Sequence, residues 1–145
     1  MKIIIEDAGE NGEELLLLRC KELSPSILRL VAEIKNQQER LVVFQDNQII
    51  RVAPADIYYF EAVDNKVFAY TDGQVFESRQ KLYELEEAFG QREFLRVSKS
   101  FLLNLSKIES ISPALDGRFE ALLDNGEKII ITRSYAKDLK KRLGI

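Results

Sequence analysis

The chain has 145 residues, a net charge of −3 and no histidine. Its length suits a domain with a sizeable core, and its 46% apolar and 31% charged residues exclude an intrinsically disordered chain. The lack of histidine excludes the commonest general base, the Ser-His triad and most zinc sites. We therefore expect no catalytic residue, no metal, no cofactor and no enzyme activity.

Residues 1–39 predict a small β-β-α extension. Residues 2–6 and 14–20 are apolar runs of strand length. Ser24-Pro25 is typical of a helix start, because serine caps the helix and proline fits its first position. The apolar residues that follow share one helical face: Ile27, Leu30, Val31 and Ile34.

The same region predicts a cytoplasmic protein. Its N-terminus lacks the long apolar segment of a signal peptide and turns acidic at Glu6. Cys20 is the only cysteine, so no internal disulfide can form. No apolar run in the chain approaches the roughly 20 residues of a membrane-spanning helix.

A polar run at residues 36–40 separates the extension from a second domain, residues 40–145. The hydrophobic pattern there changes to a period of two, which predicts strands over residues 41–45, 48–52, 57–62, 66–71 and 74–77. Turn residues such as Asp46-Asn47 and Asp72-Gly73 separate these runs. A helix closes the β-meander, and we expect three of its residues to be buried: Leu82, Leu85 and Phe89.

Residues 94–105 combine apolar and polar side chains. Four residues are expected to enter the core: Phe94, Val97, Phe101 and Leu103. Between them lie hydroxyls and cations of the kinds that contact phosphates and base edges: Arg96, Ser98, Lys99 and Ser100. Taken alone, this pattern favours a strand, a turn and a strand with a solvated outer face.

The C-terminal third is basic and again predicts strands. Residues 91–145 hold 11 Lys and Arg against 7 Asp and Glu, a net charge of +4, which permits DNA as a partner of an acidic chain. Strands are expected over residues 107–112, 118–123 and 127–132, the last two joined by the hairpin dipeptide Asn125-Gly126. A helix over residues 135–143 ends the chain.

Four motifs in chain order resemble the LytTR family, the mainly β DNA-binding module of bacterial LytR/AlgR-type transcription regulators. Residues 57–62 resemble the family's I-x-Y-x-E-A strand, and residues 82–86 resemble its L-x-x-L-E helix. Residues 94–105 resemble F-x-R-V-H-R-S-Y-L-V-N-L, with Ser98 in place of His and Lys99 in place of Arg. Residues 125–135 resemble D-G-x-x-x-x-V-S-R-x-Y.

The resemblance implies a mainly β fold with short helices, an elongated set of small antiparallel sheets over residues 40–145. It also implies loops that enter successive major grooves of direct-repeat promoter sites in double-stranded DNA. Carried over by position, it predicts base contacts from Lys66, Lys99 and Arg133. The predicted phosphate or supporting contacts are Asn65, Arg79, Arg96, Ser98, Ser100 and Lys137.

Several of these residues have other roles open to them. Lys66 fits a plain turn charge, and Arg96 could pair with Glu93 or another local acid. The Asn104 amide is expected to tie the backbone rather than contact DNA. Thr132 or Ser134 is expected to cap the last helix.

Residues 1–39 cannot hold the phosphoreceiver domain that many LytTR proteins carry, so the chain resembles the short standalone regulators. For these the resemblance implies action on the regulator's own promoter, a homodimer at least on DNA and a small membrane inhibitor protein as partner, with no small-molecule substrate. We expect the apolar faces of residues 2–6, 15–18 and 27–34 to pack on the LytTR core or to form the dimer contact.

A competing interpretation is a β-rich protein-interaction or ligand-sensing module, such as an antagonist, that does not itself bind DNA. The acidic net charge and Ser98 are compatible with it. The two interpretations differ in one observable: DNA binding requires Lys66, Lys99, Arg133 and Arg96 to converge on one surface.

Overall fold

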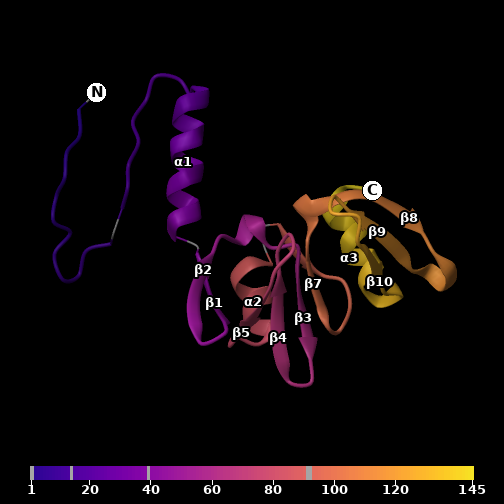
Figure 1. Cartoon of the computed structure of the whole chain (residues 1–145). Coiled ribbons are helices and arrows are strands. Elements are labelled where there is room, and N and C mark those ends of the chain that lie inside the picture. The colour runs from indigo at the N-terminus through magenta and orange to yellow at the C-terminus, as the bar shows by residue number, and fades with distance from the viewer. Residues whose placement is uncertain (1, 14, 39, 91–92) are drawn as a thin grey trace.

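The computed structural model describes residues 2–13, 15–38, 40–90 and 93–145 and is shown in Figure 1. Three α-helices are present in these ranges: α1 (Pro25–Gln38), α2 (Leu82–Phe89) and α3 (Arg133–Leu143). The strands are β1 (Leu41–Gln45), β2 (Gln48–Val52), β3 (Tyr59–Val63), β4 (Lys66–Tyr70), β5 (Val75–Ser78), β6 (Phe94–Arg96), β7 (Phe101–Asn104), β8 (Ile108–Pro113), β9 (Phe119–Leu123) and β10 (Lys128–Ile131). Short 3-10 turns precede β3, β8 and β9.

All strands lie in two antiparallel sheets, which confirms the mainly β prediction. The larger sheet has the order β2-β1-β5-β4-β3-β7-β6, and the smaller has the order β10-β9-β8. Two-residue turns with positive φ join β1 to β2 and β3 to β4, at Asp46-Asn47 and Asp64-Asn65. Such turns match the twist of paired strands, and Asp and Asn tolerate the left-handed region better than most residues.

The domain has two hydrophobic cores, which meet at β7. One core lies between the large sheet and α2 and includes Phe60, Leu85 and Leu102; Leu82 and Phe89 are buried there too, as predicted. The other joins the large sheet to the small sheet and α3, and it includes Leu103 and Leu139. Because neighbouring strand residues point to opposite faces, Leu102 and Leu103 enter different cores.

A buried amide fastens this junction. Asn104 is 1% exposed, and its Nδ2 donates to the carbonyl of Ile57 (2.8 Å). Its Oδ1 accepts from the backbone amide of Ser106 (3.0 Å) and from the Ser106 hydroxyl (2.7 Å). The expectation that Asn104 ties the backbone is confirmed.

A tyrosine–carboxylate pair also links the two sheets. The hydroxyl of Tyr58, the residue before β3, donates to the carboxylate of Asp124 in the β9–β10 turn. This hydrogen bond raises the pKa of Tyr58 to about 12, with burial and the negative charge of Asp124 as further causes.

We expect this pair to make the fold sensitive to alkali. Unfolded tyrosine ionises near pH 10, so the stabilisation by Tyr58 is complete below pH 10 and is lost as the pH rises towards 12. Thermal unfolding should therefore show a steeper fall in Tm between pH 10 and 12 for the wild type than for Tyr58→Phe. Tyr83→Phe, at an exposed tyrosine on α2, is the control and should keep the wild-type fall. Parallel curves for all three proteins would contradict this role of the pair.

The N-terminal extension differs from its prediction. The prediction of strands over residues 2–6 and 14–20 is wrong, because the described residues of these ranges form no strand. Residue 14 lies outside the described residues. The prediction that their apolar side chains pack on the domain is also wrong, since Ile5 is 92% exposed and Leu15 is 78% exposed. A strand needs a neighbour for its backbone N–H and C=O groups, and in this structure these residues pair with neither sheet. The helix is present as α1.

The last helix begins at Arg133, two residues earlier than expected, because the carbonyl of Thr132 accepts from the amides of Tyr135 and Ala136. This start makes Arg133 the first helical residue. Within the described ranges, no helix has the length and apolar character needed to cross a membrane.

Candidate nucleic-acid interface

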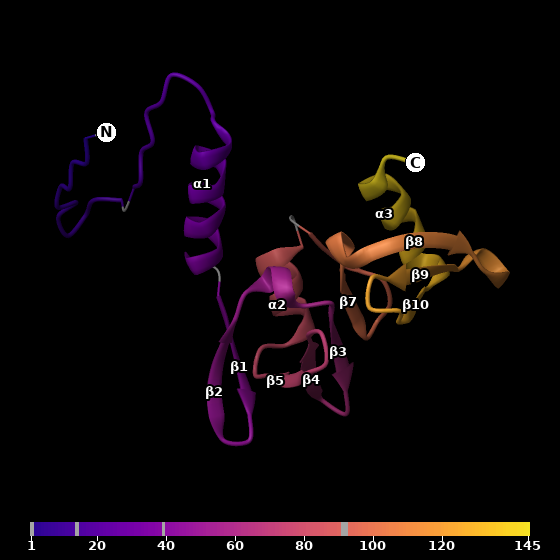
Figure 2. The same ribbon diagram turned by 45° about the horizontal axis from the view of Figure 1, so that its top comes forward.

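Three loops meet at one edge of the domain, although they are far apart in the sequence. They are the β3–β4 turn, the loop of residues 97–100 before β7, and the entry to α3 at residues 132–133. The Ala62 amide donates to the Ser100 carbonyl (2.8 Å), and the Thr132 amide donates to the Val97 carbonyl (3.0 Å). These hydrogen bonds hold the loop of residues 97–100 between the end of β3, which leads into the β3–β4 turn, and the entry to α3. Figures 1 and 2 show the hairpin tips and this loop on the same side of the sheet.

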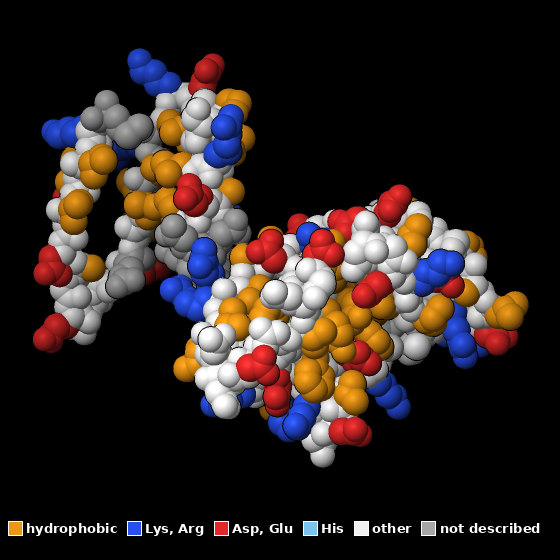
Figure 3. Space-filling view, in the orientation of Figure 1, with side chains coloured by type: hydrophobic (Ala, Val, Ile, Leu, Met, Phe, Trp, Pro, Cys, Tyr) orange, Lys and Arg blue, Asp and Glu red, His pale blue; other side chains and the backbone are white. Residues whose placement is uncertain are grey.

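Strand register adds Arg79 to this edge. Val67 pairs with Ser78, so Arg79, just after β5, lies beside Lys66 at the start of β4. The Arg79 guanidinium stacks over the Phe44 ring at 3.9 Å. Figure 3 shows Lys and Arg side chains spread along this edge, with acidic groups between them.

The loop of residues 97–100 is shaped by Arg96 and Ser98. Arg96 donates to the carbonyls of Ser98 (3.0 Å) and Lys99 (2.5 Å) and forms an ion pair with Glu86 (2.8 Å). The Ser98 hydroxyl accepts from the amides of Ser100 (3.3 Å) and Phe101 (3.1 Å). The pairing of Arg96 with a local acid, which the sequence left open beside a phosphate contact, is present, and the acid is Glu86. Contact of Arg96 or Ser98 with DNA stays a prediction.

Three cations remain available at this edge. Lys66, Lys99 and Arg133 are exposed, and their side chains have no hydrogen bond or ion pair among the residues that the structure describes. A paired cation must lose its partner before it binds DNA, whereas these need not. They are the three residues predicted to contact bases.

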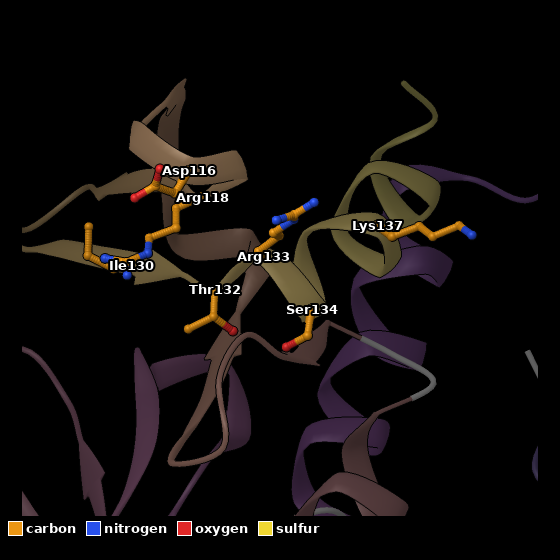
Figure 4. A pocket seen from close by; sticks show the side chains of 7 residues that line it. All are labelled: Asp116, Arg118, Ile130, Thr132, Arg133, Ser134 and Lys137. Atoms are coloured by element: carbon orange, nitrogen blue, oxygen red, sulfur yellow. The ribbon is translucent and has the colours of Figure 1, made fainter.

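An open concavity of about 1020 Å³ surrounds Arg133. Figure 4 shows its lining residues: Asp116, Arg118, Ile130, Thr132, Arg133, Ser134 and Lys137. Arg118, the residue before β9, lines the concavity, whereas Arg133 and Lys137 extend from α3. The sequence interpretation missed Arg118; its one signal was a cation directly after the Asp116-Gly117 turn in the basic third of the chain.

The expected hydroxyl cap of α3 is absent. Thr132 occupies the N-cap position, but its hydroxyl makes no capping hydrogen bond to the helix. The hydroxyl donates instead to the Val97 carbonyl (3.4 Å). Thr132 therefore links the last helix to the loop of residues 97–100, and Ser134 faces the concavity.

The contacts of Arg96 and Lys99 predict that their alanine variants differ in the salt dependence of DNA binding. Lys99→Ala should lower the slope of log affinity against log salt by about 1, because one cation that is available to DNA is lost. Arg96→Ala should weaken binding by loosening the loop while leaving that slope nearly unchanged, since its guanidinium is held within the protein. Fluorescence anisotropy titrations at several salt concentrations measure both. A slope lowered equally by Arg96→Ala would identify Arg96 as a direct phosphate contact.

Comparison with known proteins gives one consistent result. The family model described as the LytTr DNA-binding domain matches residues 47–144. The chain is 31% identical over 147 residues to a Staphylococcus aureus (strain NCTC 8325) protein named as an uncharacterized HTH-type transcriptional regulator, covering 100% of this chain and 99% of that protein. A solved LytTr DNA-binding domain from Bacillus cereus superimposes with a TM-score of 0.70 at 27% identity, covering 73% of this chain and 97% of that chain.

Longer relatives match as well. The chain is 30% identical over 125 residues to the sensory transduction protein LytT of Enterococcus faecalis, covering 86% of this chain and 52% of LytT. The match to LytT of Bacillus anthracis is 32% over 134 residues, covering 89% of this chain and 54% of that protein. The chain thus spans about half the length of these LytT relatives.

Proposed function

The chain belongs to the LytTR family of DNA-binding domains, and we propose from this membership that it is a transcription regulator that binds specific sequences in double-stranded DNA. The observation that carries the proposal is the convergence of Lys66, Lys99 and Arg133, exposed and unpaired among the described residues, on three loops at one edge. Cations of this kind bind phosphates and guanine edges. Such a regulator acts in the cytoplasm, where bacterial DNA lies.

The three loops are proposed to enter successive major grooves of direct repeats at a promoter, the regulator's own included. Lys66, Lys99 and Arg133 are assigned to base edges. The residues assigned to phosphates or to support of the loops are Asn65, Arg79, Arg96, Ser98, Ser100 and Lys137, with Arg118 added from the concavity. Lysine contacts guanine as a point charge, so Arg133, with its planar fork, should contribute most to sequence preference.

The test begins with a randomised duplex pool, from which the full chain selects its preferred site. Binding to that site, to the chain's own upstream region and to a scrambled duplex is then measured from 50 to 200 mM salt. We expect a preference for the selected site and a log–log salt slope of about −0.9 for each phosphate contacted. Equal, salt-insensitive binding to all duplexes, or none, would instead favour the competing protein-interaction or ligand-sensing module.

The apolar N-terminal extension is proposed to serve assembly. Residues 3–5 are isoleucines and residues 15–18 are leucines, and all of them are exposed. A second copy of the chain bound through these side chains would add avidity on paired repeats. A small membrane inhibitor protein is the other partner that this surface could serve. Sedimentation of the full chain with the selected duplex should show a dimer, and Leu17→Asp should reduce it to a monomer. An unchanged dimer in Leu17→Asp would remove residues 15–18 from the contact.

A further inference from the structure

The turn between β8 and β9 is held in one conformation directly beside Arg133. The Ala114 amide donates to the Arg118 carbonyl (2.9 Å), and the Arg118 amide donates to the Leu115 carbonyl (3.3 Å). Asp116 and Gly117 are both left-handed, with φ of 60° and 75°. Two successive left-handed residues reverse the chain sharply, and the turn lies in contact with α3.

Gly117 lies next to the Arg133 side chain. A Cβ atom at this residue would lie 3.2 Å from Cγ, 3.3 Å from Cδ and 3.5 Å from Nε of Arg133. These distances are at or below ordinary carbon–carbon contact. The Arg133 stem therefore packs against the bare backbone of Gly117, and a Cβ atom there would require this stem to shift by a few tenths of an ångström.

We propose that Gly117 is a positioning residue that sets the direction of the Arg133 guanidinium and thereby the base preference of the domain. This inference rests on the proposed function. A guanidinium reads guanine through two parallel N–H bonds, which require its plane to be aligned with the base edge. An exposed arginine stem samples many rotamers, so packing against the turn reduces the ordering that binding must supply.

The chain offers a matched control for the backbone. Gly126, in the β9–β10 turn, has φ of 90°, and a Cβ built on it meets nothing within 4 Å. Alanine at either residue is strained by the left-handed backbone to a similar degree. Only Gly117→Ala also displaces Arg133. The exposed arginine yields more readily than the backbone, so both variants should lose Tm by similar amounts.

The experiment compares wild type, Gly117→Ala, Gly126→Ala, Arg133→Ala and the Gly117→Ala/Arg133→Ala double variant as full chains. Each is titrated with the selected duplex and with the scrambled duplex. Gly117→Ala should lower the ratio of the two affinities by about 3- to 10-fold, a part of what one base-reading arginine supplies. Gly126→Ala should keep the wild-type ratio. In the Arg133→Ala background, Gly117→Ala should lower the affinity ratio no further, because Gly117 acts through Arg133.

A second measurement does not need DNA. The Nε–Hε signal of Arg133 in a nitrogen-15 NMR spectrum should shift in Gly117→Ala and stay in place in Gly126→Ala. An unmoved signal, an unchanged affinity ratio, or an equal loss in the Arg133→Ala background would each overturn the positioning role while leaving the proposed function standing. Wild-type chain that fails to prefer its selected duplex would overturn the proposed function, and this inference with it.

Discussion

Replacing Arg133 with alanine is expected to cost about 1–3 kcal/mol of binding free energy on the preferred site, roughly a 5- to 150-fold loss of affinity. Arg133 begins α3, projects beside an open concavity and has no hydrogen bond or ion pair among the described residues. Its guanidinium is therefore available for a bidentate contact with a guanine, which no alanine can make. Affinity for a scrambled duplex should fall much less, so the preference itself should flatten.

Arg51→Ala is the matched control, because it also removes one exposed arginine charge. Arg51 lies on β2, at the opposite edge of the large sheet from β7 and β6. It should change affinity little and leave the preference intact. Lys137→Ala should weaken binding uniformly across sequences, as a phosphate contact does. Equal losses on every duplex for Arg133→Ala would recast Arg133 as a phosphate contact.

Replacing Asn104 with leucine is expected to destabilise the fold by about 2–4 kcal/mol. The substitution removes the donor to the buried Ile57 carbonyl and the acceptor for the Ser106 amide. A buried polar group left without a partner costs about 1–3 kcal/mol. Because β7 joins both hydrophobic cores, the loss should affect the whole domain rather than one sheet. Urea unfolding followed by circular dichroism measures it.

Ser106→Ala tests one of the hydrogen bonds of Asn104 separately from the others. It deletes the hydroxyl that donates to Asn104 but keeps the Asn104–Ile57 hydrogen bond. Since Ser106 is exposed, its hydroxyl can be replaced by water, and the expected loss is below about 1 kcal/mol. A leucine variant as stable as Ser106→Ala would show that the buried amide is not needed for stability.

Most of the domain's secondary structure could be predicted from the sequence, because its signals are local. Strands over residues 41–77 follow from alternating apolar residues between Asp, Asn and Gly turns, and α2 follows from the spacing of Leu82, Leu85 and Phe89. The strands predicted over residues 2–6 and 14–20 show where this reasoning stops. An apolar run can form a strand only if a neighbouring strand pairs with its backbone, and a short sequence pattern does not show whether such a strand lies nearby in the fold.

The candidate site divides in the same way. Residue types and their order pointed to Lys66, Lys99 and Arg133, since each belongs to a turn or motif that can be recognised locally. Their meeting at one edge depends on hydrogen bonds between Ala62 and Ser100 and between Val97 and Thr132.

By itself the sequence determined most strands and helices of residues 40–145, the order of the motifs and the residue types available for DNA. Only the tertiary structure decided which cations are engaged within the protein and which are available. Arg96 is held by Glu86, and the stem of Arg133 lies on Gly117. The physical reason is that a side chain's partner is set by packing and by backbone hydrogen bonds between distant segments, whereas periodicity and turn chemistry reach only a few residues along the chain.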